Sequence, residues 1–98
     1  MSVHVKQYRP AFFEGFTDEE ADVKSASELL AIPFMDHWIK DPNFDRLCIS
    51  HPYSDYPTYH NLIAEMKDGS HWVVANLQGE PDEPLFKYFP KWIPKSVK

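Results

Sequence analysis

The stretch YHNLIAEMKDGSHWVVANL, residues 59–77, decides the fold. Apolar and polar residues alternate on both sides of its Asp68-Gly69 dipeptide, and this dipeptide favours the two-residue turn of a β-hairpin. The pattern therefore predicts two antiparallel strands, one over residues 60–67 and the other over residues 72–77.

The predicted register assigns each hairpin residue to one of two faces, because paired residues point to the same side. Counting outward from a two-residue turn pairs Lys67 with Ser70 and Leu62 with Ala75. One face is then apolar and suited to a core: Leu62, Ala64, Met66, Val73, Ala75 and Leu77. The other face is mixed: Asn61, Ile63, Glu65, Lys67, Trp72, Val74 and Asn76.

A helical layer is predicted upstream, over residues 25–40. Ser25 and Glu28 have the spacing of a capping box, which marks a helix start. Pro33 either kinks this helix or opens a second one at its first turn. An apolar stripe at helical spacing should cover the apolar face of the hairpin, and consists of Leu29, Leu30, Phe34, Trp38 and Ile39.

Alternation predicts further strands at residues 3–8 and 44–50, whereas the polar residues 17–24 suggest a loop. The proline-containing residues 79–84 suggest a connector. Together these elements predict one α+β domain over residues 1–98, with an antiparallel sheet of three to five strands and one helical layer packed on it. Such a short chain buries a small core, so association into a homodimer would stabilise it.

Composition and charge restrict the class of protein. The single cysteine, Cys48, and the lack of any apolar run near the roughly 20 residues of a membrane span predict a cytoplasmic protein without membrane contact. The net charge of −5 arises between Glu14 and Glu28, where six acids accompany one lysine. Nucleic-acid binding is disfavoured because it normally needs a basic face. The acidic segment 14–28 is interpreted as a solvated face, with contact to a basic partner as the alternative.

The stretch HPYSDYPTYH, residues 51–60, is the densest cluster of chemically active side chains. His51 and His60 would meet at the base of this loop with Asp55 above them, and three such side chains could hold a metal ion. Two histidines at this spacing are a weak motif, and no phosphate loop, GxSxG or HExxH is present. We therefore expect no catalytic residue and no cofactor.

Two surfaces are predicted to bind a partner. The first is the loop itself, through Tyr53, Asp55, Tyr56 and Tyr59, because tyrosine combines a large amphipathic ring with few rotatable bonds. The second is the apolar centre of the mixed hairpin face: Ile63, Trp72 and Val74. The aromatic residues of the C-terminal segment 85–98 would instead cover that second face, and this alternative is slightly favoured.

Within residues 25–77, the order of SASELLAIPFMDHW, NFDRLCIS and LIAEMKDGSHWVVANL resembles small uncharacterised proteins of bacteriophages and prophages. The resemblance implies a phage-type accessory or host-modulating protein and implies no activity. The predicted function is a non-enzymatic module that binds another protein by occupying its surface. The alternative is a small metal- or His-dependent enzyme centred on residues 51–60.

Overall fold

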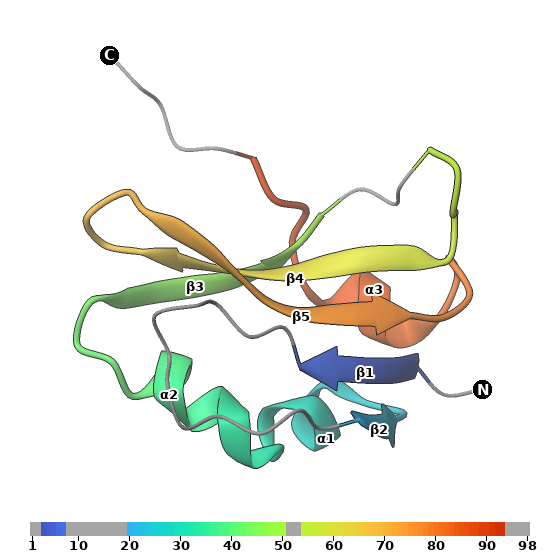
Figure 1. The fold of residues 1–98 in the computed structure, drawn as a ribbon, viewed down its shortest axis with the longest axis horizontal. Helices are drawn as coiled ribbons and strands as arrows, with labels where there is room; N and C mark the ends of the chain where they lie inside the picture. The colour runs from blue at the N-terminus through green and yellow to red at the C-terminus, as the bar shows by residue number, and fades with distance from the viewer. Residues whose placement is uncertain (1–2, 8–19, 51–53, 94–98) are drawn as a thin grey trace.

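The computed structural model describes residues 3–7, 20–50 and 54–93 and has an α+β fold (Figure 1). Its antiparallel sheet contains five strands in the order β2-β1-β5-β4-β3. The strands are β1 Val3–Gln7, β2 Glu20–Val23, β3 Phe44–Ile49, β4 Tyr59–Met66 and β5 His71–Gln78. The helices are α1 Ala26–Leu30, the 3₁₀ helix η1 Pro33–Met35, α2 Asp36–Ile39 and α3 Pro84–Tyr88. The predicted fold class and strand number are confirmed.

The predicted helical layer is divided into three short pieces. Ser25 caps α1 as expected, since its hydroxyl accepts a hydrogen bond from the Glu28 N–H at 3.3 Å. The Glu28 carboxylate accepts its bond from the Lys24 N–H and not from that of Ser25. Pro33 begins η1, where its missing N–H costs nothing. Local side-chain chemistry therefore explains where these helices begin.

One face of the sheet carries the hydrophobic core. Val5 pairs with Leu77 and Leu62 pairs with both Ala75 and Ile49, so these side chains share a face. They form one buried cluster with side chains from every helical element: Leu29, Phe34, Met35, Trp38, Leu85, Phe86 and Phe89. All the helices therefore cover this face, and Figure 1 shows α3 behind β5.

The apolar stripe of the helical layer is only partly buried. Leu29, Phe34 and Trp38 lie in the core, as predicted. Leu30 is half-buried, and Ile39 is exposed at the end of α2. The stripe fails at Ile39 because α2 is a single turn and ends there.

β2 is a strand where a loop was expected. The prediction of a loop over 17–24 is wrong in its described part, since Glu20–Val23 pairs with β1. Val23 and Ala21 face the core side opposite Val3 and Val5, while the two acids between and before them point outward. Two of its four residues are acidic, so its own sequence does not have the apolar alternation of a strand. Pairing with β1 is what stabilises it in the extended conformation.

The hairpin lies where it was predicted, but its turn has three residues instead of two. The Met66 N–H donates to the Ser70 carbonyl at 2.8 Å, and the Gly69 N–H donates to the Met66 carbonyl at 3.0 Å. Among the described residues only Gly69 has a positive φ, of 93°. A type I′ turn needs two such residues, so this turn belongs instead to the type I class that ends in a left-handed glycine.

A second irregularity in the hairpin restores the predicted register. Near the turn, each β4 residue pairs with the β5 residue one position before the predicted partner: Glu65 with His71, Ala64 with Trp72, and Ile63 with Val73. The register then shifts, and Leu62 pairs with Ala75 as predicted. Val74 is the extra residue of this bulge and lies in the core. Val73 consequently leaves the predicted core face.

Candidate binding surface

The loop before β4 presents two exposed tyrosines. Tyr56 is 60% exposed and Tyr59 is 36% exposed, and their ring centroids are 5.7 Å apart at a tilt of 47°. Asp55 is exposed beside them. Tyr53 lies outside the described residues, so the structure brings together three of the four predicted binding residues of this loop.

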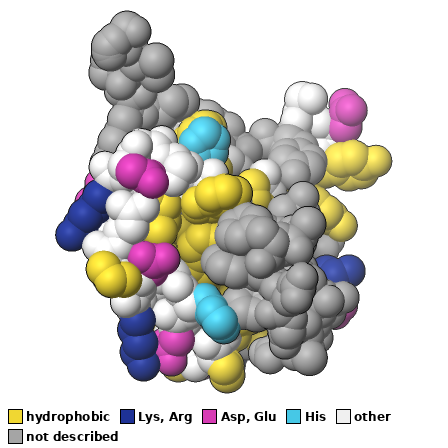
Figure 2. Space-filling model, turned by 60° about the vertical axis from the view of Figure 1, so that its left-hand side comes forward, with side chains coloured by type: hydrophobic (Ala, Val, Ile, Leu, Met, Phe, Trp, Pro, Cys, Tyr) yellow, Lys and Arg dark blue, Asp and Glu magenta, His cyan; other side chains and the backbone are white. Residues whose placement is uncertain are grey.

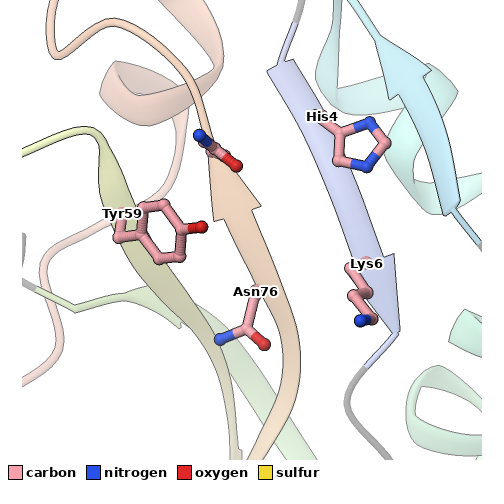
Figure 3. A pocket seen from close by; sticks show the side chains of 5 residues that line it. His4, Lys6, Tyr59 and Asn76 are labelled. Atoms are coloured by element: carbon pink, nitrogen blue, oxygen red, sulfur yellow. The ribbon is translucent and has the colours of Figure 1, made fainter. Parts of the chain in front are cut away.

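Two rows of polar side chains cross the sheet next to these tyrosines, on the face opposite the core. His4 pairs with Gln78, which pairs with Tyr59 on the other side; Lys6 pairs in the same way with Asn76. These five residues line a hollow of about 280 Å³. β1, β5 and β4 therefore each contribute to one polar site (Figure 3).

Tyr59 and Lys6 are directed toward β5 between them, whereas the His4 ring is directed toward Glu20 and Asp22 on β2. Figure 3 shows the Tyr59 hydroxyl and the Lys6 ammonium approaching β5 from its two sides. The Asn76 side-chain N–H donates to the Asn61 side-chain oxygen at 2.9 Å, and this bond directs the Asn76 oxygen toward the Lys6 side. The hollow is thus lined by an ammonium group and by a carboxamide oxygen.

His4 links β1 to the acidic strand β2. Its Nδ1 lies 3.1 Å from Asp22 Oδ1 and its Nε2 lies 3.1 Å from Glu20 Oε1. In the described part of the acidic segment, the carboxylates of Glu20 and Asp22 both contact His4. The Glu28 carboxylate accepts a hydrogen bond from the Lys24 N–H just before α1. Glu14 lies outside the described residues.

The second predicted binding surface does not exist as one face. Ile63 and Val74 are buried, and only Val74 belongs to the core cluster, so the two lie on opposite sides of the sheet. Trp72 is partly exposed but pairs with Ala64, on the core side of the strand. The bulge at Val74 is the reason, because it changes which side each residue nearer the turn occupies. Figure 2 shows hydrophobic side chains gathered among charged ones on the end of the molecule that includes the hairpin turn.

The aromatic C-terminal segment does not cover the mixed face as expected. Phe86 and Phe89 pack in the core, on the side of the sheet that the other helices cover. The chain then follows the edge of β3, where the Ile49 N–H donates to the Pro90 carbonyl and the Trp92 N–H donates to the Ile49 carbonyl, both at 2.9 Å. Trp92 lies on the mixed face, with its ring centroid 4.7 Å from that of His71.

A partly buried ion pair joins β3 to β4. Glu65 is 1% exposed, and its Oε1 accepts from Arg46 Nε at 2.9 Å and from Arg46 Nη2 at 2.8 Å. The hydrogen bond to Glu65 raises the pKa of the Arg46 guanidinium. Arg46 also donates to the Ile93 carbonyl at 3.5 Å, so the pair connects β3, β4 and the C-terminal segment.

The metal site considered as the alternative for residues 51–60 lacks one of its candidate ligands, because His60 lies in the core. His60 is buried, and its ring stacks on Phe86 with centroids 4.2 Å apart. Asp55 is exposed in the loop, and His51 lies outside the described residues. Across residues 3–7, 20–50 and 54–93, no three His, Cys, Asp or Glu side chains are placed to hold a metal ion. The alternation of β4 points His60 inward, which the sequence analysis did not consider.

Comparison with known proteins adds no relative: no family model, no curated protein and no solved structure matches this chain. Within the described part of the chain, no helix has the length and apolar character to cross a membrane.

Sequence reasoning missed the hollow because its residues come from three strands that are distant in the sequence. His4 and Lys6 alternate with Val3 and Val5, so their position opposite the core could have been read from the pattern of residues 3–8. Their closeness to Tyr59 depends on β1 pairing with β5, and no local pattern indicates that pairing.

Proposed function

We propose that this protein is a non-enzymatic module that acts by occupying the surface of another protein. The observation that supports the proposal most is the exposed ring pair of Tyr56 and Tyr59, which adjoins the polar hollow. Tyrosine is enriched among the residues that carry most of the energy of protein interfaces, because it contributes a large contact area at a low cost in side-chain entropy. Asp55 and the hollow would form a polar rim around the rings.

The resemblance of residues 25–77 to small bacteriophage and prophage proteins supports an accessory or host-modulating role within this proposal. A module of that kind needs no catalytic group. It acts because its bound surface excludes other molecules from the partner.

Capture of a partner from lysate of the source cells, followed by calorimetry with the purified partner, tests the proposal. Tyr56→Ala should weaken binding about tenfold or more, as truncation of a central tyrosine does. Tyr88→Ala is the matched control, because Tyr88 is also exposed but lies on α3. Both variants should keep the melting temperature of the wild type. Equal affinity of the wild type, Tyr56→Ala and Tyr59→Ala would overturn the proposal.

A further inference from the structure

The polar hollow differs in charge from the chain around it. The protein carries a net charge of −5, yet the five side chains that line the hollow include the ammonium group of Lys6 and no acid. We propose that this hollow binds the carboxylate of an acidic side chain in a peptide segment of the partner, an inference that rests on the function proposed above.

Lys6 supplies the charge for this recognition. Glu20 is its cross-strand neighbour on β2, but the Glu20 carboxylate lies 3.1 Å from His4 Nε2. Among the residues that the structure describes, no carboxylate lies within ion-pair distance of the Lys6 ammonium. The ammonium is directed toward Asn76 and the hollow (Figure 3). Lys6 therefore attracts an anion from outside its own strand pair.

The hydrogen-bonding groups favour a peptide carboxylate over a bare anion. The Gln78 carboxamide can donate an N–H to a carboxylate oxygen. Asn76, whose N–H is bonded to Asn61, turns its oxygen toward the hollow and can accept a hydrogen bond from the ligand. A peptide presents both a carboxylate and backbone N–H donors, whereas an ionised phosphate presents chiefly acceptor oxygens. The hollow is thus complementary to an acidic side chain together with its neighbouring backbone.

The position of the hollow joins this inference to the tyrosine pair. Tyr59 lines the hollow and also contacts Tyr56. A partner segment that packs on the two rings would place its next side chains over Lys6 and Asn76, because neighbouring strands of a sheet lie about 4.8 Å apart. The two tyrosine rings and the hollow would then bind adjacent residues of one partner segment.

Three probes test the inference on the intact protein by ¹H–¹⁵N NMR: N-acetylglutamate amide, N-acetylglutamine amide and inorganic phosphate. The glutamate probe should shift the backbone resonances of β1 and of Asn76 and Gln78, and the glutamine probe should not. Lys6→Met should weaken the binding of the glutamate probe about two- to fivefold, as expected for a partly exposed ion pair. Lys87→Met is the matched control on α3 and should leave it unchanged.

Two results would overturn the inference without any variant. One is the absence of shifts in this region at about 50 mM of the glutamate probe, well above the millimolar affinity expected for so small a ligand. The other is equal or tighter binding of phosphate at the same residues. The proposed function is separable from this result: partner binding that needs Tyr56 but is unaffected by Lys6→Met would reject carboxylate recognition alone. Partner binding that needs neither residue would reject the proposed function as well.

Discussion

Gly69 has a φ of 93°, a conformation that other L-amino acids rarely adopt, and a Cβ built there meets nothing within 4 Å. The effect of a substitution is therefore confined to the backbone. We predict that Gly69→Val lowers the free energy of unfolding by about 1–2 kcal/mol, measured by urea denaturation. Gly69→Asn should cost less, because asparagine tolerates the left-handed region. Equal stability of Gly69→Val and the wild type would contradict the turn described here.

Asp68 makes the stability of the turn dependent on pH. The Ser70 hydroxyl donates to its carboxylate at 2.6 Å and the Ser70 N–H at 2.9 Å, and these bonds lower the pKa of Asp68. A lowered pKa means that the folded state favours the ionised form, so this contribution is complete above the unfolded-state pKa of about 3.9 and is lost as the pH falls through the folded-state pKa. We predict that Asp68→Ala destabilises the protein at about pH 7 and that its difference from the wild type disappears in strong acid.

Urea denaturation at the two pH values checks the prediction for Asp68. Ser70→Ala is the control, because it removes one donor while the carboxylate remains. A difference between Asp68→Ala and the wild type that stays constant with pH would show that packing, and not the ionised carboxylate, is responsible.

Sequence reasoning succeeded at residues whose conformation depends on near neighbours. The cap at Ser25 and the position of the Asp68-Gly69 turn were predicted, and a helix start at Pro33 was one of two alternatives, because each depends on bonds within a few residues. The inward direction of His60 was missed. It depends on packing against Phe86, which is 26 residues away in the sequence.

At the scale of secondary-structure elements, α2 is stabilised by what it buries. It has a single turn, too short to be stable by its own hydrogen bonds, and Trp38 is 2% exposed within the core. We predict that Trp38→Ala lowers the free energy of unfolding by about 3–5 kcal/mol, as large-to-small changes in packed sites do. Ile39→Ala, at the exposed neighbouring position, should cost less than about 1 kcal/mol. Similar costs for the two variants, measured by chemical denaturation, would show that Trp38 is not a core residue.

The Arg46–Glu65 pair joins β3 to β4. Removing one partner should lower the free energy of unfolding more than removing both. Arg46→Met leaves the carboxylate of Glu65 buried without its cation, and we predict a loss of about 2–3 kcal/mol. The figure is moderate because the Arg46 side chain is 38% exposed, so water screens part of the interaction. The double variant Arg46→Met/Glu65→Met should recover most of the loss.

A thermodynamic cycle over the two single variants and the double variant measures this coupling. Additive losses would contradict an ion pair that acts as a unit.

The missed strand β2 shows the limit of pattern reasoning at this scale. Its sequence EADV has acids at alternate positions and no apolar run. Val23 is buried only because β1 pairs with it, so the information that makes this segment a strand lies in residues 3–7. The bulge at Val74 is similar, since nothing in the run of two valines indicates which of them is the extra residue.

At the scale of the whole molecule, the C-terminal segment is part of the core. Leu85, Phe86 and Phe89 belong to the same buried cluster as the strands. We therefore predict that deletion of residues 85–98 unfolds the protein or causes it to aggregate, as followed by circular dichroism and size-exclusion chromatography. Tyr88→Ala, an exposed position on the same helix, should retain the fold. A folded, monomeric truncation would contradict the shared core.

The fold class was predictable because hairpin alternation, helix caps and turn residues agree on one architecture. The order of strands was not, because β1 pairs with β5 across most of the chain. The same long-range pairing assembles the hollow from His4, Lys6 and Tyr59. The prediction of the tyrosine loop as a binding surface relied only on local exposure. The prediction of the hairpin face relied on the strand register, which the bulge at Val74 changes.

The three-residue turn and the bulge at Val74 shift the hairpin register by one residue in opposite directions. The same length of chain would therefore also close with a two-residue turn and no bulge. In that arrangement Trp72 would leave the side of Ala64 for the side of Glu65. The pairing below the bulge would be identical in both cases. The length of the turn thus decides on which surface of the protein the aromatic side chain of Trp72 lies.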